Sequence, residues 1–434
     1  MPSEGRLGRA PMESSTGRIG HDGSMAKVVV VGGGAAGLVA AWRAASLGHR
    51  VLLLEANGRL GVKLRISGGG KCNITHDGPP QALLAAFSKE QGRFLRPSLH
   101  AFDNGAVLAL LRREGVETYT RDNGRIFPLD RPGSAAAVVV AFETLARRAG
   151  VEVRTGARVT ALRGYAPRLE GLLLDEAMVT ADTYILATGG ASYPETGTRG
   201  EVLGWLKGLG ALVRPWFPAL APIPLQQARP AWEGVALRGG ELRLSAGPEG
   251  RRLGAFAGDI VFTKSGISGP AALELSQTTE WARRDGPAWL AYASILDAPA
   301  DLDAALQSEQ RANPRLRAAN WMGRHLPERL LEPLLQEAGM DPGLMLKDLP
   351  KAGRRTLVTL VTGLPLGEPQ AVPLARGEVA AGGVALAAVD PRTMALQGWE
   401  NLRVCGELLD IDGPVGGYNL QAAFSTGFMA GSLE

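Results

Sequence analysis

The residue types that could do chemistry are concentrated in one short stretch, SGGGKCNITH at residues 67–76. Three glycines precede a lysine, a cysteine and an asparagine, and a histidine lies just beyond. Taken alone, the stretch allows five interpretations: a phosphate-binding loop, a metal site, a redox-active cysteine, a glycosylation site or a loop without chemistry. Each interpretation predicts a different protein, so the rest of the chain has to decide between them.

Metal, disulfide and glycan chemistry are disfavoured by what the chain lacks. Cys72 and His76 are four residues apart, but no second pair has ligand spacing, so we expect no metal site. The other cysteine, Cys405, is far away in sequence, which does not suit a disulfide-reductase mechanism. The sequon at residues 73–75 needs a secretory signal, and none is recognisable. Cys72 is then a small residue packed beside a cofactor or, as the less favoured alternative, a tuned thiol.

A stronger signal begins at residue 26 with AKVVVVGGGAAGLVAAWRAASLGHRVLLLEA. The apolar run 28–31 predicts a strand buried on both faces. Gly32, Gly34 and Gly37 then form G-x-G-x-x-G, which suits a tight turn, a close approach to pyrophosphate and close packing of helix on strand. The helix that follows should end at Gly48. Ala35 and Ala36 lie at its N-terminus, where free N–H groups favour phosphate.

An acidic residue completes this dinucleotide-binding pattern. A second buried strand, residues 51–54, ends at Glu55, about twenty residues after the glycines, as the fingerprint expects. A carboxylate there can accept hydrogen bonds from ribose hydroxyls and disfavours a 2′-phosphate. The pattern predicts a bound dinucleotide, but it does not distinguish FAD from NAD.

The elements that must position these residues come from two distant parts of the chain. Residues 103–190 are typical of α/β structure. They include a helix with Asp103 as N-cap, three short strands (VEVRT, ARVTAL and GLLL) in a meander, and a turn-like NGRIFP. A buried strand at 184–187 stops at Thr188-Gly189-Gly190. A similar strand at 402–405 stops at Gly406 and leads to a helix opened by Gly416-Gly417. The C-terminal part should therefore complete the N-terminal nucleotide domain.

The intervening chain has a different texture. Prolines and alternating strand-like pieces predominate after residue 193, and helical patterns follow. We predict an α/β fold in which an insert interrupts the nucleotide-binding domain, with these limits: a disordered extension 1–24, a first part 25–192, an insert 193–367 (strands about 193–297, helices about 298–362) and a completion 368–434.

Composition excludes several function classes. With 45% hydrophobic and 21% charged residues and a net charge of +4, the composition is that of a globular protein. The chain contains no Lys/Arg-rich run interleaved with aromatic residues, so its charge pattern does not predict nucleic-acid binding. No apolar segment reaches membrane-spanning length, and two distant cysteines fit a reducing compartment, so we expect a cytoplasmic protein. Residues 1–24 could also be an expression remnant or an over-long start, with Met25 as the alternative start.

Three motifs together, GGGAAGL…LLE, SGGGKCNIT and GELLDIDGPVGGYNLQ, resemble the flavoprotein family of NAD(P)/FAD-dependent oxidoreductases. That family includes bile-acid dienoyl reductases and proteins described as aminoacetone oxidases. ATGGASYPETG, NGRIFP, FTKSGISGPAALELS and AAGGV also match, and the resemblance covers nearly all of residues 25–434. It implies FAD as cofactor, a Rossmann-type FAD-binding domain split in sequence, and an insert made of a β-barrel and a helical piece.

The resemblance also implies roles for individual residues. The ADP half would be held by Gly32, Gly34, Gly37 and Glu55. The pyrophosphate and flavin would lie along Lys63, Ser67, Gly70, Lys71, Cys72 and Asn73. The adenine would contact Val159, the dinucleotide Thr188 and Gly189, and the pyrophosphate or ribityl chain Gly406 and Glu407. The isoalloxazine ring would be approached by Gly417, Tyr418, Asn419, Leu420 and Gln421.

The expected reaction is an FAD-dependent reduction of a small organic molecule. NAD(P)H would dock transiently, because no second dinucleotide fingerprint exists. The weak candidates for acid–base work are Arg125, Tyr193, Lys264 and Tyr418. The alternatives are an oxidase that passes electrons from a small amine to O₂, and a flavin-bound module that binds RNA or another partner without catalysis. The oligomeric state does not follow from the sequence.

Overall fold

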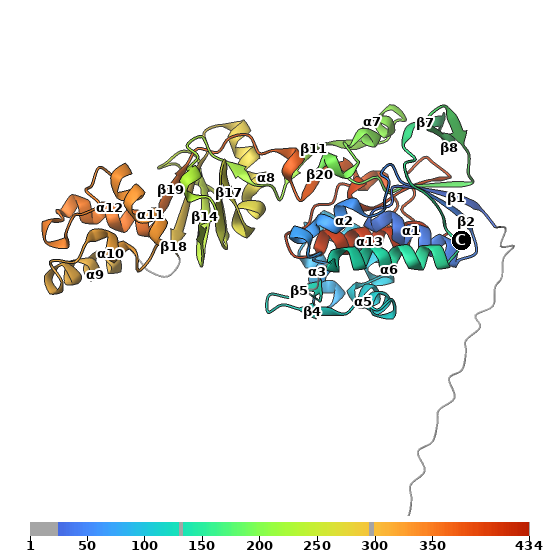
Figure 1. Ribbon diagram of the computed structural model, residues 1–434. Coiled ribbons are helices and arrows are strands. Elements are labelled where there is room, and N and C mark those ends of the chain that lie inside the picture. Colours follow the sequence, from blue (N-terminus) through green and yellow to red (C-terminus); the bar gives the residue numbers. More distant parts are fainter. Residues whose placement is uncertain (1–24, 130–132, 295–298, 434) are drawn as a thin grey trace, which may run out of the picture.

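The computed structural model describes residues 25–129, 133–294 and 299–433 (Figure 1). An α/β body contains both the first and the last parts of the chain, and an insert from the middle of the chain extends to one side of it. The extension expected at 1–24 lies outside the described residues. In the described part of the chain, no helix combines the length and apolar character needed to cross a membrane.

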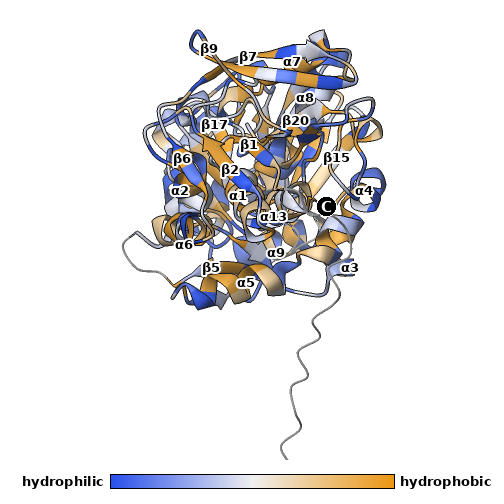
Figure 2. Ribbon diagram, turned by 90° about the vertical axis from the view of Figure 1, so that its right-hand side faces the viewer, coloured by the Kyte–Doolittle hydropathy of each residue, from blue (hydrophilic) through white to orange (hydrophobic). Residues whose placement is uncertain are grey.

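A five-stranded parallel sheet forms the centre of the α/β body. Its order is β21-β10-β1-β2-β6, and every neighbouring pair is parallel. The strands are β1 (Lys27–Val31), β2 (Arg50–Leu54), β6 (Glu152–Arg154), β10 (Thr183–Leu186) and β21 (Leu402–Val404). Apolar residues run along β2 inside the body (Figure 2). Since β21 follows the insert in sequence, both ends of the chain build this one sheet, as predicted.

Helices cover the sheet, and two of them approach each other very closely. A Cβ atom added to Gly427 or Gly431 of α13 would overlap the carbonyl oxygen of Ala36 or Ala40 in α1. Asp103 caps α5 as predicted, accepting a 2.8 Å hydrogen bond from the Ala106 amide. The helices of this body are α1 (Ala35–Ser46), α2 (Val62–Ile66), α3 (Pro80–Ala85), α4 (Lys89–Ala101), α5 (Asn104–Arg113), α6 (Ser134–Arg148), α7 (Glu201–Gly208) and α13 (Tyr418–Gly431).

The α/β body also contains two small antiparallel sheets. Their strands differ from the sequence-based expectations for NGRIFP and for VEVRT. The first has the order β3 (Thr75–His76), β5 (Arg125–Pro128), β4 (Thr118–Thr120), so NGRIFP is half strand: Ile126 and Phe127 are buried and hold β5 in place. The second is a meander of β7 (Val159–Tyr165), β8 (Arg168–Leu174) and β9 (Ala177–Val179). VEVRT is not part of that meander, because β6 pairs with the edge strand β2.

The insert contains two four-stranded antiparallel sheets and a group of helices. The first sheet has the order β12 (Ile223–Pro224), β17 (Gly266–Ser268), β16 (Ile260–Thr263), β13 (Ala236–Leu237), and the second β15 (Arg252–Ala257), β14 (Gly240–Ser245), β18 (Trp289–Ser294), β19 (Leu364–Gly367). Helix α8 (Pro270–Asp285) contacts strands of both sheets. The outer end consists of α9 (Pro299–Ala312), α10 (Ala318–Met322), α11 (Glu328–Glu337) and α12 (Lys351–Thr362) (Figure 1).

Buried side chains form two large clusters, one for each part. One cluster draws on both ends of the chain, while the other runs from Ile223 to Leu366. Val202, Leu203 and Leu206 of α7 belong to the first cluster, so α7 packs with the α/β body although it follows residue 193. The domain limits themselves stay predictions.

The chain passes between the two parts on adjacent antiparallel strands, β11 (Val213–Ala219) and β20 (Val379–Val384). A third, small cluster of buried residues lies there, which we call the junction cluster: Phe217, Ala219, Leu220, Val379 and Ala381. Leu273 of α8 and Val415, which precedes α13, pack against it. The junction therefore brings the insert next to the segment that leads into the last helix.

Candidate functional site

A cavity of about 680 Å³ lies at the carboxyl ends of the parallel strands. Loops that follow β1, β2, β10 and β21 all contribute to its wall, through residues such as Gly34, Glu55, Thr188 and Gly406. Open α/β sheets bind their ligands at this end of the strands, because the loops there diverge and leave a crevice. The cavity continues to the junction, where Leu220 and Leu273 line it.

The glycines of the β1–α1 turn have different physical tasks. A Cβ atom on Gly37 would overlap the carbonyl oxygen of Gly32, so Gly37 permits helix α1 to pack on the strand that precedes it. A Cβ atom on Gly34 would meet no protein atom within 4 Å. Gly34 lines the cavity and caps α1 without a side-chain hydrogen bond, so its open side faces space that a ligand can fill.

Glu55 is anchored at the end of β2 with both carboxylate oxygens in use. Oε2 accepts a 2.7 Å hydrogen bond from the Gly33 amide, and Oε1 accepts hydrogen bonds from the amide and the side chain of Asn57 at 2.8 and 2.7 Å. The residue is 7% exposed and lines the cavity. Each carboxylate oxygen has a further lone pair, so Glu55 can still accept from ribose hydroxyls.

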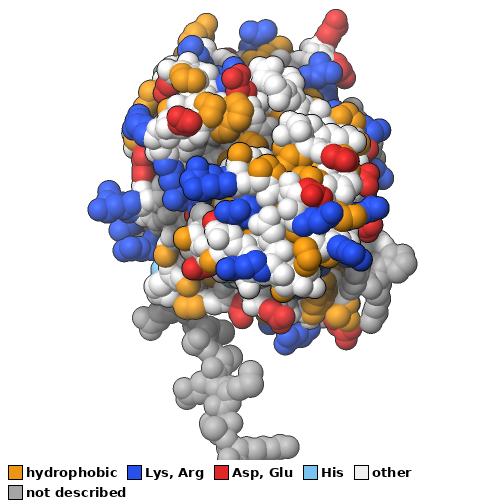
Figure 3. Space-filling model, turned by 90° about the vertical axis from the view of Figure 1, so that its left-hand side faces the viewer, with side chains coloured by type: hydrophobic (Ala, Val, Ile, Leu, Met, Phe, Trp, Pro, Cys, Tyr) orange, Lys and Arg blue, Asp and Glu red, His pale blue; other side chains and the backbone are white. Residues whose placement is uncertain are grey.

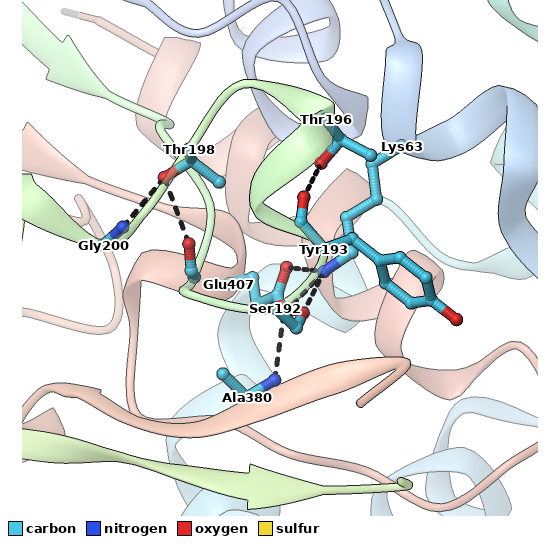
Figure 4. A network of polar contacts seen from close by, with 9 residues as sticks. Lys63, Ser192, Tyr193, Thr196, Thr198, Gly200, Ala380 and Glu407 are labelled. Atoms are coloured by element: carbon cyan, nitrogen blue, oxygen red, sulfur yellow. Dashed lines mark hydrogen bonds and ion pairs between the residues drawn. The ribbon is translucent and has the colours of Figure 1, made fainter. Parts of the chain in front are cut away.

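Lys63 and Glu407 form an ion pair in the wall of the cavity (Figure 4). Lys63 Nζ donates to Glu407 Oε1 and Oε2 at 2.9 and 2.7 Å and to Ser192 Oγ at 2.6 Å. Glu407 Oε1 also accepts from the Ala380 amide at 3.0 Å. The network therefore ties the loop after β21 to α2, to the loop after β10 and to β20. Glu407 lines the cavity as expected, but its charge is balanced by Lys63.

Replacing Lys63 with methionine should weaken FAD binding by roughly 10- to 100-fold, because the Glu407 carboxylate would face an anionic pyrophosphate without a compensating cation. The dissociation constant, measured by the change in flavin fluorescence, tests this expectation. Lys207→Met on the exposed side of α7 serves as control. Adding Glu407→Gln to Lys63→Met should recover most of the affinity. Unchanged affinity in Lys63→Met would contradict this role of the ion pair.

Among the residues that the structure describes, one buried polar atom in the cavity wall has no partner. Thr188 Oγ1 is buried and has no hydrogen bond among the described residues. Such atoms are costly unless a ligand or water satisfies them. Thr188 follows β10 at the carboxyl end of the sheet and lines the cavity beside Gly189. Together with the open side of Gly34, this hydroxyl fits a bound dinucleotide.

The stretch SGGGKCNITH forms the wall next to α2. Ser67, Lys71 and Asn73 line the cavity, and so do Gly68 and Gly69, whereas Gly70 does not. Cys72 is also absent from the cavity wall. Its side chain is fully buried in the core cluster, and burial raises the pKa of the thiol to about 12. This pKa opposes the tuned-thiol alternative. Burial also raises the pKa of Cys405 to about 12.

The start of α13 divides its predicted contacts into two groups. Gly417, Asn419 and Leu420 line the cavity. Tyr418 instead stacks on the His76 ring at 4.8 Å, and Gln421 is buried, where it accepts from Thr75 Oγ1 and donates to the carbonyl oxygen of Phe102. Neither of these two side chains lines the cavity, and their approach to the flavin ring stays a prediction. The ADP-side residues Gly32, Ala35, Ala36 and Val159 line it, while Gly37 serves packing.

The four candidates for acid–base work separate in the same way. Arg125 and Tyr193 line the cavity, whereas Lys264 is exposed in the β16–β17 turn and the half-buried Tyr418 stacks on His76 and is not part of the lining. Within the described residues, the Arg125 guanidinium forms no hydrogen bond or ion pair. Its strand β5 places it at the edge of the cavity, so the charge that looked out of place in NGRIFP faces the site.

Two carboxyl groups at the junction were missed from the sequence. Glu378 precedes β20 and lines the cavity. Burial raises its pKa above the usual range, although Arg125 and Lys63 act in the opposite direction. Glu274 of α8 accepts a 2.6 Å hydrogen bond from the Val415 amide, and burial raises its pKa too. Each is a lone acidic residue in an apolar stretch, which is a weak signal.

Among the described residues, no group of three or more His, Cys, Asp or Glu side chains could hold a metal ion.

Comparison with known proteins gives the same picture of the whole chain. The family model described as "HI0933-like protein Rossmann domain" matches residues 26–433. The chain is 29% identical over 423 residues to the 3-dehydro-bile acid delta(4,6)-reductase of Clostridium scindens, covering 94% of this chain and 98% of that protein. It is 27% identical over 403 residues to the ribosomal RNA dihydrouridine synthase of Escherichia coli, covering 92% and 95%.

Solved structures share the fold across nearly the whole chain. Among them is a 3-ketosteroid delta1-dehydrogenase from Sterolibacterium denitrificans, with a TM-score of 0.53 and 14% sequence identity. The match covers 94% of this chain and 98% of that one. At this level of identity the likeness concerns the arrangement of the elements.

Proposed function

The chain belongs to the HI0933-like protein family of FAD-dependent oxidoreductases, and on this premise we propose that it is a reductase of a carbon–carbon double bond conjugated to a carbonyl group. FAD is the bound cofactor and NAD(P)H the transient electron donor. The substrate is a small organic molecule that enters the cavity at the junction between the α/β body and the insert. A Rossmann-type domain split by a barrel-and-helix insert would build that junction.

The chemistry in the names of two relatives supports this reaction class. A 3-dehydro-bile acid with double bonds at positions 4 and 6 is a conjugated ketone, and its reductase saturates that system. Dihydrouridine is uridine whose ring double bond, next to a carbonyl, has been reduced. This chain matches more than nine-tenths of both relatives. The two substrates differ greatly in size, but each contains a carbon–carbon double bond conjugated to a carbonyl group.

The observation that carries the proposal is the cavity wall itself. One end consists of the dinucleotide-binding turn, with Gly34 open and Glu55 anchored, and the other end consists of polar groups at the junction. FAD, when bound, supplies the hydride chemistry. The N-terminus of α13, near Asn419 and Leu420, supplies a positive dipole end that stabilises the negative charge of a reduced flavin. Lys63 neutralises Glu407 so that an anionic cofactor can lie beside it.

Rapid mixing of the FAD-loaded protein with NADH and with NADPH tests the proposal. We expect one of the two nucleotides to bleach the flavin absorbance within the time of a turnover, and a conjugated enone to restore it without oxygen. If neither nucleotide bleaches the flavin, the reductase proposal is wrong. Release of peroxide with a small amine as electron donor would instead support an oxidase.

A nucleic-acid substrate is the second candidate, because one relative is named for its action on ribosomal RNA. The outer helical end of the insert carries both basic and acidic side chains on its surface (Figure 3). Anaerobic reoxidation of the reduced protein by a uridine-rich RNA, and not by free enones, would favour this candidate. An RNA mobility shift without any reoxidation would favour a binding module without catalysis.

A further inference from the structure

Polar groups from four separate segments meet at the junction end of the cavity. Arg125 comes from β5, Tyr193 from the loop after β10, and Glu378 from the residue before β20. All three line the cavity. Glu274 of α8 lies behind them and holds the Val415 amide. The insert and both parts of the α/β body thus contribute to one polar group of residues.

In the part of the chain that the structure describes, three of these side chains have no polar partner. Within the described residues, the Arg125 guanidinium, the Glu378 carboxyl and the Tyr193 hydroxyl form no hydrogen bond or ion pair. Lys63, in the same wall, is by contrast fully engaged with Glu407 and Ser192. Glu378 is exposed, and Arg125 and Tyr193 are half-buried, so all three side chains are accessible to a ligand in the cavity. A ligand there can supply their polar partners.

Burial of Glu378, and not the charges around it, favours the protonated carboxyl group. Burial opposes its negative charge, and the nearby cations Arg125 and Lys63 compensate only in part, so its pKa is raised. Glu274 is close enough to be affected by Glu378, which contributes to its own raised pKa. Glu378 likewise contributes to the raised pKa of Tyr193. A neutral carboxyl can donate a hydrogen bond or a proton into the cavity.

We propose that Arg125 and Glu378 form the substrate end of the site, where Arg125 binds the carbonyl oxygen of the conjugated substrate and protonated Glu378 supplies a proton to its α carbon. This inference rests on the proposed reductase function and deepens it. It selects substrates with a hydrogen-bond-accepting carbonyl, such as an enone or a cyclic imide, and excludes isolated double bonds.

The electron and proton balance of this reaction is complete. The β carbon of the substrate gains a hydride, whose electrons come from the nicotinamide by way of the flavin. The electron pair of the double bond moves to the carbonyl oxygen, where Arg125 holds the negative charge. The carbonyl re-forms as the α carbon takes the proton of Glu378. Glu378 is left as a carboxylate next to Arg125 and regains a proton from water, while the nicotinamide is oxidised.

A phenolate is a suitable probe, because it presents a planar ring with a negatively charged oxygen, as the reacting substrate does. We expect 4-nitrophenolate to bind the oxidised, FAD-loaded protein and to perturb the flavin absorbance. Arg125→Met should weaken this binding by roughly 10- to 100-fold, and Arg125→Lys by less, because the single charge remains. Lys264→Met, which removes an exposed cation outside the cavity, should have no effect.

The pH dependence of probe binding tests Glu378 separately. Protonated Glu378 can donate to the phenolate, whereas its carboxylate repels it, so the dissociation constant calculated for the phenolate should rise as pH increases through the raised pKa. The groups that face Glu378 are Arg125, Lys63, Glu274 and Tyr193. Glu378→Gln should abolish this pH dependence, and Glu274→Gln, whose amide oxygen can still accept from Val415, should keep it.

Reduction of the flavin by NAD(P)H is a separate reaction that does not need Glu378. Glu378→Gln should be reduced at the wild-type rate and should be reoxidised by 2-cyclohexen-1-one at least tenfold more slowly. Failure of the wild-type protein to bind 4-nitrophenolate, equal binding by Arg125→Met, or an unchanged pH dependence in Glu378→Gln would each overturn the inference. If nicotinamide fails to bleach the flavin while Arg125 and Glu378 still govern probe binding, the reductase proposal and the proton transfer fail, and the binding roles of Arg125 and Glu378 stand.

Discussion

Gly37→Ala should leave the protein without FAD and lower the free energy of unfolding of the α/β body by about 3 kcal/mol. The added methyl group would overlap the carbonyl oxygen of Gly32 and lie 3.0 Å from its carbonyl carbon, so it meets backbone rather than a flexible side chain. Helix α1 or the β1–α1 turn must then move, and both carry the dinucleotide site. Urea unfolding followed by circular dichroism, together with the flavin content after purification, measures the two effects.

Gly34→Ala, three residues earlier in the same motif, is the matched control. Its added methyl group would meet no protein atom within 4 Å, so the free energy of unfolding should change by less than about 1 kcal/mol. Its methyl group would nevertheless project toward the cavity and keep the pyrophosphate away from the backbone. We therefore expect a folded protein that binds FAD poorly. If Gly37→Ala is as stable as Gly34→Ala, the assignment of Gly37 to packing is wrong.

Glu280→Gln should destabilise the insert by about 3 kcal/mol. Glu280 in α8 has a side chain only 2% exposed, and it accepts hydrogen bonds from Arg283, Arg284 and the Val372 amide. It thereby fixes the returning chain to α8 just before β20. Although burial opposes its charge, the hydrogen bonds to Arg283, Val372 and Arg284 lower its pKa to about 2, against 4.5 for an ordinary glutamate.

The sign of the pH effect follows from this lowered pKa. In the unfolded chain Glu280 takes up its proton near pH 4.5, but in the folded protein it does so only near pH 2. Its contribution to stability is therefore complete above pH 4.5 and is lost as the pH falls toward 2. Urea midpoints of tryptophan fluorescence at a series of pH values should show a shallower acid dependence in Glu280→Gln than in the wild-type protein.

Glu241→Gln provides the comparison for Glu280. Glu241 on β14 also binds two arginines, Arg243 and Arg252, but its side chain is 22% exposed and those of its partners about half exposed. A surface cluster of this kind should contribute less than about 1 kcal/mol. Equal effects of Glu280→Gln and Glu241→Gln would show that the Val372 amide and the burial of Glu280 have no special importance.

The nucleotide-binding half of the fold was accessible from the sequence because its signals are local. A run of four valines, glycines at set spacing and an acidic residue after the next apolar run fix β1, α1 and β2 without knowledge of distant contacts. The strands ending at Thr188 and Gly406 were found to within one residue, since each is a buried apolar run that stops at glycine. The position of the cavity followed from the same signals.

Other features depend on contacts that spacing cannot specify. β6 is only three residues long, so its sequence does not predict which strand it pairs with. It joins the parallel sheet because it pairs with the free edge of β2. At the start of α13, successive side chains point about 100° apart, so the helix rotation decides that Asn419 and Leu420 face the cavity while Gln421 faces Thr75. Glu378 comes close to Arg125 and Lys63 only when the fold brings β5 and α2 next to the start of β20.

The order of the elements along the chain has a consequence for how the protein folds during synthesis. The insert is continuous in sequence, from Ile223 to Leu366, and its buried cluster can form as soon as those residues have left the ribosome. The parallel sheet must wait for β21, and α1 must wait for the glycines of α13 that pack against it. The nascent chain can therefore carry a folded insert while β10 still lacks its outer neighbour β21 and α1 lacks its partner helix α13. Chaperones that shield apolar surfaces would act on β10 and α1 in this interval.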